Sequence, residues 1–131
     1  MCLLNSDSPT LPTRLLVQAA FVLAEPCDRV VLGPAEDGGY YVIGMKAPHI
    51  HLFQNTAWST ENVAEETRAR ARALGLPVVE LETWYDDDAA SLRRLCRDLT
   101  SDSVSNLSPF AAPATVACLA RLRIPDLLAA A

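Results

Sequence analysis

The sequence is poor in aromatic residues and in positive charge, and both shortages exclude classes of protein. Aromatic residues make up 6% of the 131 residues, so a core must be built mainly from Leu, Val and Ala. The 11 Lys and Arg residues are outnumbered by 16 Asp and Glu residues, which gives a formal net charge of −5. Because a nucleic-acid-binding surface needs an excess of basic residues, we expect no nucleic-acid partner.

Long apolar runs and paired cysteine motifs are absent as well. No segment approaches the ~20 apolar residues of a membrane-spanning helix, so we expect no membrane partner. The first ten residues contain no basic residue and only a short apolar run, which does not predict a signal peptide. The four cysteines show no CxxC spacing and indicate isolated reduced thiols. The expectation is a cytoplasmic protein.

What is present is an alternation of strands and helices over the length of one domain. Short apolar runs predict strands at 1–4, 29–32, 40–45 and 77–81, and helical spacing predicts helices at 12–24, 59–74, 89–99 and 114–122. This alternation predicts an α/β fold with an open, largely parallel sheet and helices on both faces. Within the single domain, 1–131, we expect core βα units over 1–99, a linker over 100–113 and a C-terminal helical segment over 114–131.

The first apolar run, Met1 to Leu4, has no polar alternation. Such a run is typical of a central parallel strand that is covered on both faces. Central strands usually follow earlier βα units, yet this one begins at the first residue. We therefore expect the chain to enter the fold part-way, without its amino-terminal units. A sheet edge exposed in this way can pair with another copy, so a homo-oligomer is a further expectation.

Three acidic turns follow predicted strands, namely Asp7, the pair Glu36 and Asp37, and the run from Asp86 to Asp88. Open α/β sheets bind ligands at the carboxyl ends of their strands. Carboxylates from two strand ends suffice for Mg²⁺ or Mn²⁺, because these cations fill their other positions with water and substrate phosphates. Each turn also has an ordinary structural interpretation, since Asp commonly caps a helix or begins a turn. Spacing alone does not choose between the two.

Four strings occur in the order typical of one bacterial family: NSDSPTLP at 5–12, GPAEDGGYYVIG at 33–44, WST at 58–60 and WYD at 84–86. They resemble the motifs of a glycosyltransferase-like family of radical-SAM/selenodomain-associated transferases, often filed as a domain of unknown function. That family is similar to GT-A-fold transferases. The resemblance implies a three-layer α/β sandwich with an open mixed sheet, like that of nucleotide-diphospho-sugar transferases, lacking its amino-terminal nucleotide-binding half.

The resemblance also implies roles for particular residues. Asp7 would be the metal-binding aspartate of the DxD type, with Asp86 and Asp88 completing a catalytic site for Mg²⁺ or Mn²⁺. The acidic run is about one residue shorter than the family's usual WYDVD, so the choice among Asp86, Asp87 and Asp88 stays open. The implied substrate-binding residues are Ser6, Glu36, Asp37, Gly38, Gly39, Tyr40, Ser59 and Thr60. Amide groups near the last two, at a predicted helix start, would hold a phosphate or carboxylate.

The implied function is metal-dependent transfer of a glycosyl group from a nucleotide-activated sugar. A nucleotide sugar or a nucleotide would be the substrate if the missing half completes the site. Nucleotidyl transfer, as by a guanylyltransferase, uses the same metal geometry and remains an alternative. A third possibility is a catalytically inactive remnant that acts only through self-association.

Overall fold

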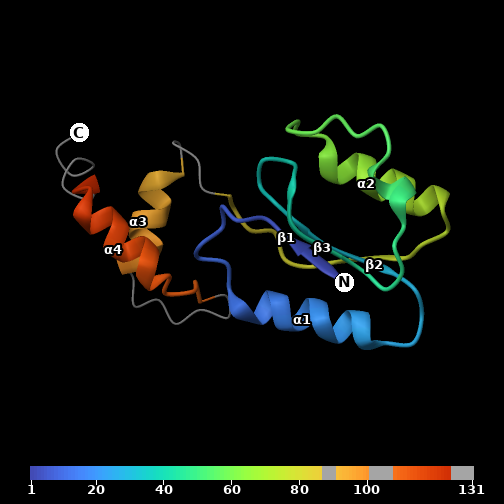
Figure 1. The fold of residues 1–131 in the computed structure, drawn as a ribbon, viewed down its shortest axis with the longest axis horizontal. Coiled ribbons are helices and arrows are strands. Elements are labelled where there is room, and N and C mark those ends of the chain that lie inside the picture. The colour runs from blue at the N-terminus through green and yellow to red at the C-terminus, as the bar shows by residue number, and fades with distance from the viewer. Residues whose placement is uncertain (87–90, 101–107, 125–131) are drawn as a thin grey trace.

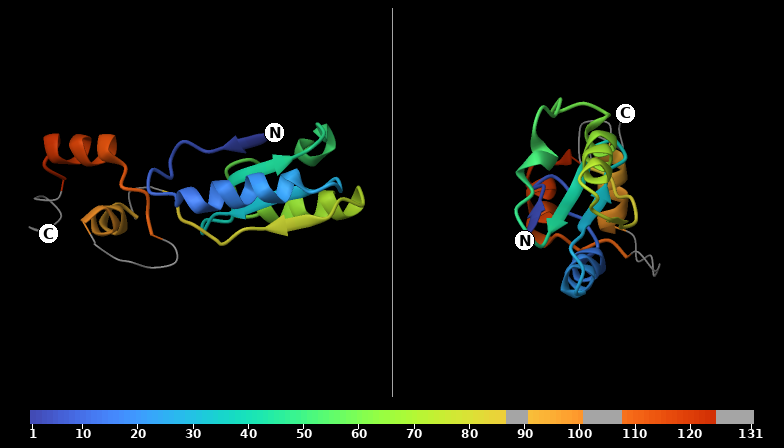
Figure 2. Two further views of the ribbon diagram at one scale, coloured as in Figure 1. Left: turned by 90° about the horizontal axis from the view of Figure 1, so that it is seen from below. Right: turned by 90° about the vertical axis from the view of Figure 1, so that its right-hand side faces the viewer.

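The structure is a computed structural model that describes residues 1–86, 91–100 and 108–124. Its elements, in chain order, are β1 (Cys2–Leu4), α1 (Thr13–Ala24), β2 (Val30–Pro34), β3 (Tyr40–Met45), the 3₁₀ helix η1 (Ile50–Phe53), α2 (Val63–Ala73), β4 (Val78–Glu80), α3 (Leu92–Thr100) and α4 (Pro113–Arg121). Figure 1 shows α1 on one face of the sheet and α2 on the other, while α3 and α4 lie together at one end. The views in Figure 2 agree with this three-layer arrangement.

The sheet is mixed, with strand order β1-β3-β2-β4. β3 runs antiparallel to both of its neighbours, and β2 pairs with β4 in parallel. The antiparallel strand follows from the short turn before it, since Ala35 N–H donates to the Gly39 carbonyl at 3.0 Å and reverses the chain. Such a connection is too short for the crossover that parallel strands need. The prediction of an open sheet with helices on both faces is confirmed, and the sheet is mixed, as the resemblance implies. The largely parallel sheet expected from the alternation is wrong, because β3 makes both of its pairings antiparallel.

The core has two apolar layers because the sheet is covered on both faces. Between the sheet and α1 lie Leu11, Leu15, Ala19, Val31, Tyr41, Val42, Leu81, Trp84 and Tyr85. Between the sheet and α2 with η1 lie Val30, Leu32, Ile43, Met45, Leu52, Ala64 and Ala71. Successive residues of β2 alternate between the layers, and all of them are buried. This explains why β2 reads as an unbroken apolar run.

β1 departs from the sequence-based expectation. Its apolar composition predicts a strand covered on both faces, yet Leu3 and Leu4 are 49% and 51% exposed. Among the described strands β1 is an edge that pairs only with β3, where Leu3 lies opposite Ile43. Ile43 belongs to the layer beneath α2, so Leu3 continues that apolar face beyond the area that is covered. An apolar strand sequence indicates that the strand can be covered on both faces. The described residues cover β1 only in part.

α2 begins at Val63, several residues after the predicted start at Ser59 or Thr60. Ser59 has a φ of 61°, in the left-handed region, and cannot begin a right-handed helix. The Thr60 hydroxyl donates to the Ala57 carbonyl at 2.8 Å and so closes a turn instead of capping α2. The predicted stop at Gly75 is confirmed, because this residue takes a φ of 67°.

The carboxyl-terminal part follows the predicted order. α4 starts at Pro113, next to the predicted start, and residues 108–112 form no regular element. The first residues of the helix predicted at 89–99, most of the predicted linker and the end of the chain lie outside the described residues. Across the described ranges, no helix has the length and apolar character needed to cross a bilayer. The four cysteines are free thiols, as predicted.

Leu15 tests the α1 layer of the core, because its side chain is fully buried against the sheet. We expect Leu15→Ala to lower the free energy of unfolding by about 2 to 5 kcal/mol, since it removes apolar contacts and leaves a cavity. Val17 is exposed on the same helix, and Val17→Ala should change that free energy by less than about 0.5 kcal/mol. Urea denaturation followed by circular dichroism measures both variants, and equal losses would contradict this packing.

Candidate active site

A polar pocket of about 390 Å³ opens where β1, β2 and β4 end and β3 begins. We call it the acidic pocket, because three of the side chains that line it are carboxylates. Its lining consists of Asp37, Gly39, Tyr40, Trp58, Ser59, Thr60, Glu61, Val63 and Asp86. The pocket therefore lies at the carboxyl edge of the parallel strands, where open α/β sheets bind their ligands.

The turn between β2 and β3 forms one wall of the pocket. Gly38 N–H donates to the Ala35 carbonyl at 3.2 Å, and Gly39 N–H donates to Asp37 Oδ1 at 2.8 Å. The Gly38 carbonyl accepts the N–H of Ala64, in the first turn of α2, at 2.9 Å. One of the unpaired N–H groups at the start of α2 is thereby satisfied by the turn. This bond holds α2 and the loop before it against the pocket.

Gly38 is required at its position on two grounds. Its φ of 91° is a conformation that L-residues rarely adopt, and a Cβ there would lie 1.9 Å from the Glu61 carbonyl oxygen. Because Gly38 has no Cβ, the β2–β3 turn can contact the segment that precedes α2, and both segments line the pocket.

Asp86 is held at the end of a segment that extends the sheet past β4. Ala35 and Trp84 form a parallel bridge, with Glu36 N–H donating to the Trp84 carbonyl at 3.0 Å. Asp86 Oδ1 then accepts hydrogen bonds from Asn5 Nδ2 and Ser8 Oγ, each at 2.7 Å. The turn after β1 thus orients the carboxylate that follows β4.

Partial burial raises the pKa of the Asp86 carboxyl, and this effect outweighs the hydrogen bonds from Ser8 and Asn5, which lower it. The negative charges of Asp37 and Asp7 raise the same pKa further. The three carboxylates come from three different strand ends and lie within electrostatic reach of one another. This convergence is the one that the acidic turns in the sequence predict. Asp7 itself is exposed, outside the pocket lining.

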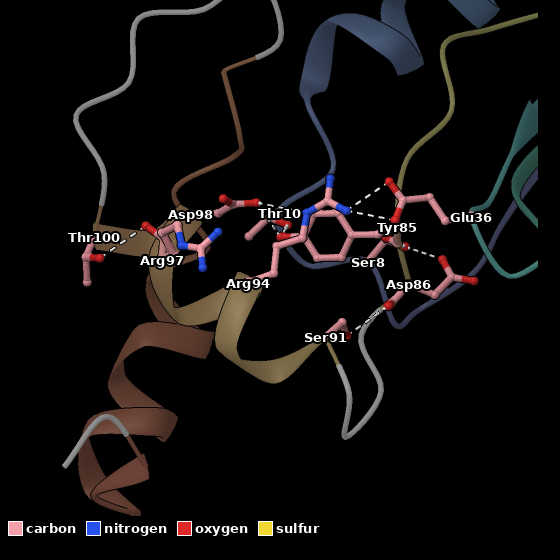
Figure 3. Close-up of polar contacts among 10 residues, drawn as sticks. All are labelled: Ser8, Thr10, Glu36, Tyr85, Asp86, Ser91, Arg94, Arg97, Asp98 and Thr100. Carbon is pink, nitrogen blue, oxygen red and sulfur yellow. Dashed lines mark hydrogen bonds and ion pairs between the residues drawn. The ribbon is translucent and has the colours of Figure 1, made fainter. Parts of the chain in front are cut away.

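α3 closes against this edge through Arg94. Both oxygens of Glu36 accept hydrogen bonds from Arg94 Nη1 at 2.8 Å, and the guanidinium lies 3.9 Å from the centre of the Tyr85 ring. Tyr85 OH donates to Asp98 Oδ2 at 2.7 Å and lies 2.9 Å from Thr10 Oγ1. Figure 3 shows these side chains stacked between the strand end and the helix. Glu36 therefore faces α3 and stands outside the pocket lining.

The structure brings most of the sequence-predicted substrate residues to one place. Asp37, Gly39, Tyr40, Ser59 and Thr60 line the acidic pocket together with Asp86. Gly38 shapes the pocket through its backbone, whereas Ser6 is exposed beside Asp7. Asp87 and Asp88, the alternatives left open for the second metal ligand, lie outside the described residues.

Sequence reasoning missed Asn5 and Ser8 as partners of Asp86, and Arg94 as the partner of Glu36. The first two carry a local signal, because Asn5 Nδ2 donates to Ser8 Oγ at 3.1 Å, an arrangement that an Asn followed three residues later by Ser favours. Arg94 carries no such signal. Its role depends on how α3 docks against a strand end that is 58 residues away in the chain.

The donor set suits a cation that is only partly held by protein. Within the described residues, no group of three or more His, Cys, Asp or Glu side chains is arranged to hold a metal ion. Asp86 with Asp7 or Asp37 supplies two carboxylates, which is the number that Mg²⁺ usually takes alongside water and substrate phosphates. Two of these carboxylates would suit Mg²⁺ or Mn²⁺, with the other positions of the cation left to water and substrate phosphates.

Comparison with known proteins agrees with this architecture. Residues 1–60, which contain the first three of the four strings, match a family described as "Uncharacterized protein conserved in bacteria (DUF2064)". The structure is similar, with a TM-score of 0.71 and 30% sequence identity, to a protein from Desulfovibrio desulfuricans G20 named as a "putative nucleotide-diphospho-sugar transferase". The fold prediction is confirmed.

The matched region covers 92% of this chain and 53% of that protein, so this chain spans about half of its length. None of the curated proteins matches the chain in sequence. The family match is to proteins of uncharacterised function, and the structural match is to a protein named as a nucleotide-diphospho-sugar transferase.

Gly38 and Gly75 form a matched pair for testing the wall of the pocket. Both have positive φ, but a Cβ at Gly75 would meet nothing within 4 Å. We expect Gly75→Ala to cost about 1 kcal/mol of unfolding free energy from backbone strain alone, and Gly38→Ala to cost about 3 kcal/mol. Urea denaturation measures the difference, and equal costs would show that the Gly38–Glu61 contact has no importance.

The pH dependence of stability reports on Asp86. Because its pKa is raised in the folded state, the folded protein binds more protons than the unfolded chain, and this group's contribution to stability falls as pH rises from about 3 through the raised pKa. Asp86→Asn removes that penalty while its side-chain oxygen can still accept from Asn5 and Ser8. We therefore expect the variant to gain stability relative to the native chain as pH rises.

Urea denaturation at a series of pH values, in buffer with a metal chelator, measures this gain. Asp28→Asn is the control, because Asp28 lies 3.0 Å from His49 and its removal should give no gain. A stability difference between Asp86→Asn and the native chain that is constant with pH would contradict the raised pKa.

Proposed function

We propose that the acidic pocket belongs to a metal-dependent transferase that moves a glycosyl group from a nucleotide-activated sugar. The observation that carries the proposal is that Asp37 and Asp86, from two different strand ends, line one pocket in which Asn5 and Ser8 hold the Asp86 carboxylate. The likeness to a nucleotide-diphospho-sugar transferase supports the class of donor. Because this chain spans about half of that protein, the activity of a whole enzyme is part of the proposal.

Asp86 and Asp7 would hold the divalent cation. When bound, Mg²⁺ or Mn²⁺ supplies positive charge that stabilises the departing diphosphate. Burial and neighbouring carboxylates disfavour the charged form of Asp86, and a cation relieves that cost. Asn5 and Ser8 hold the carboxylate in one orientation, so little reorganisation is needed when a ligand binds.

The remaining pocket residues would position the sugar and the acceptor. Ser59 and Thr60 offer hydroxyl groups, and Trp58 offers a ring face that is 55% exposed. In the transfer, the acceptor oxygen bonds to the anomeric carbon while the bond from that carbon to the diphosphate oxygen breaks. The bonding electron pair leaves with the nucleoside diphosphate, and a carboxylate of the pocket takes up the acceptor's proton.

Metal binding tests the proposal directly. We expect Mn²⁺, followed by electron paramagnetic resonance in the presence of a nucleoside diphosphate, to bind about 10-fold or more weakly to Asp86→Asn and Asp7→Asn than to the native chain. Asp28→Asn is the matched control, because Asp28 precedes β2 and so lies at the opposite end of that strand. Native Mn²⁺ affinity in both pocket variants, with circular dichroism unchanged, would refute the site.

The released product separates the two transfer chemistries. Incubation with Mn²⁺ and a panel of nucleotide sugars and alcohols should release a nucleoside diphosphate, whereas nucleotidyl transfer from a nucleoside triphosphate releases pyrophosphate. Chromatography of the nucleotides distinguishes these outcomes. Pyrophosphate release that depends on Asp86 would replace glycosyl transfer with nucleotidyl transfer at the same site.

A further inference from the structure

A second hollow, of about 340 Å³, adjoins the acidic pocket and is lined mainly by apolar side chains. Leu3 and Leu4 of β1 and Ile43 of β3 line it from the sheet, while Phe53 and Trp58 line it from the chain between β3 and α2. We call it the apolar groove. It lies where the sheet extends past the cover of η1 and α2, which is why its apolar lining remains accessible.

The apolar groove and the acidic pocket are continuous, because Tyr40 and Trp58 line both. Asn5, which also lines the groove, reaches the Asp86 carboxylate at 2.7 Å. One small molecule can thus contact the groove and the pocket together.

The wall of the groove is a stacked aromatic pair. The rings of Phe53 and Trp58 have centroids 6.4 Å apart and planes inclined by 19°. Two residues of this loop, Asn55 and Ser59, have φ values of 52° and 61°, conformations that carry strain and cluster at ligand-binding sites. Rigid aromatic side chains provide a large contact area at little entropic cost. The pair is suited to contact a ring or a short alkyl group.

We infer that the apolar groove binds the non-polar part of the acceptor, an uncharged alcohol whose hydroxyl reaches the acidic pocket; this inference rests on the proposed function. A nucleobase fits less well, because its polar edges need hydrogen-bond partners. The groove offers the amide of Asn5, which already donates to Asp86 and Ser8. An anionic acceptor is disfavoured by the carboxylates Asp37, Glu61 and Asp86 of the adjoining pocket.

Methyl-group NMR of the native chain tests the groove, with benzyl alcohol as the probe. We expect benzyl alcohol to shift the methyl signals of Leu3, Leu4 and Ile43 in a saturable manner. Val17 on α1 and Leu122 next to α4 are 46% and 56% exposed, and their methyl signals should not move. The cyclic polyol myo-inositol, similar in size but polar, should leave all five signals in place. Equal shifts at the groove and at these two exposed positions would overturn the inference.

Leu3→Asp places a charge in the groove at a half-exposed edge position, so it should leave the fold intact. We expect it to weaken benzyl alcohol binding about 10-fold, measured at the Ile43 methyl signal. Leu122→Asp adds the same charge at an exposed apolar position outside the groove lining and should not alter binding. Native affinity in Leu3→Asp would overturn the inference.

Mn²⁺ added to the same samples separates this inference from the proposed function. A cation at Asp86 should broaden the signal of Leu4, which directly precedes the Asp86 partner Asn5, more than that of Leu122. Broadening without benzyl alcohol shifts overturns the groove assignment and leaves the proposed function standing. Shifts without broadening refute the proposed function, and the acceptor assignment with it. A doubled mass in light scattering that abolishes the shifts would assign the groove to a second copy of this chain.

Discussion

The hydrogen bond between the Gly38 carbonyl and the Ala64 N–H is the contact on which the rest of the arrangement depends. It joins the turn between β2 and β3 to the first turn of α2. It also brings the loop carrying Ser59 and Thr60 to the same pocket as Asp37. The backbone of the β2–β3 turn and of the start of α2 therefore sets the positions of the side chains that line the pocket.

Most of the elements could be predicted from the sequence because their apolar patterns are local. α1 and β3 fall within one residue of their predicted bounds. The resemblance implied a mixed sheet, but which strand is reversed was not predicted, since an apolar run carries no information on strand direction. The exposure of β1 was not predicted either, because composition indicates what a strand could bury and not what lies beside it.

The residues of the candidate site were likewise predictable only in part. Asp37, Tyr40 and Asp86 were identifiable, because carboxylates and turn residues at strand ends have a recognisable pattern and a family resemblance. The pairing of Glu36 with Arg94 was not, since it arises from the docking of α3 and leaves no trace in either local sequence. The position of Asp86 was expected from the sequence. Its hydrogen bonds with Asn5 and Ser8 were not, because only the fold brings these residues to it. Its partial burial beside other negative charges disfavours its charged form.

Asn5 and Asp86 are separated by 81 positions in the chain, and Ser8 and Asp86 by 78. Contacts of such long range form late, because the entropy of closing a large loop must be overcome before they contribute. The carboxylate is therefore oriented only when β1, β3, β2 and the extension of β4 have all assembled into one sheet. In a partly folded chain Asp86 would be an ordinary solvated carboxyl group. Its fixed orientation and raised pKa would arise only when the sheet is complete.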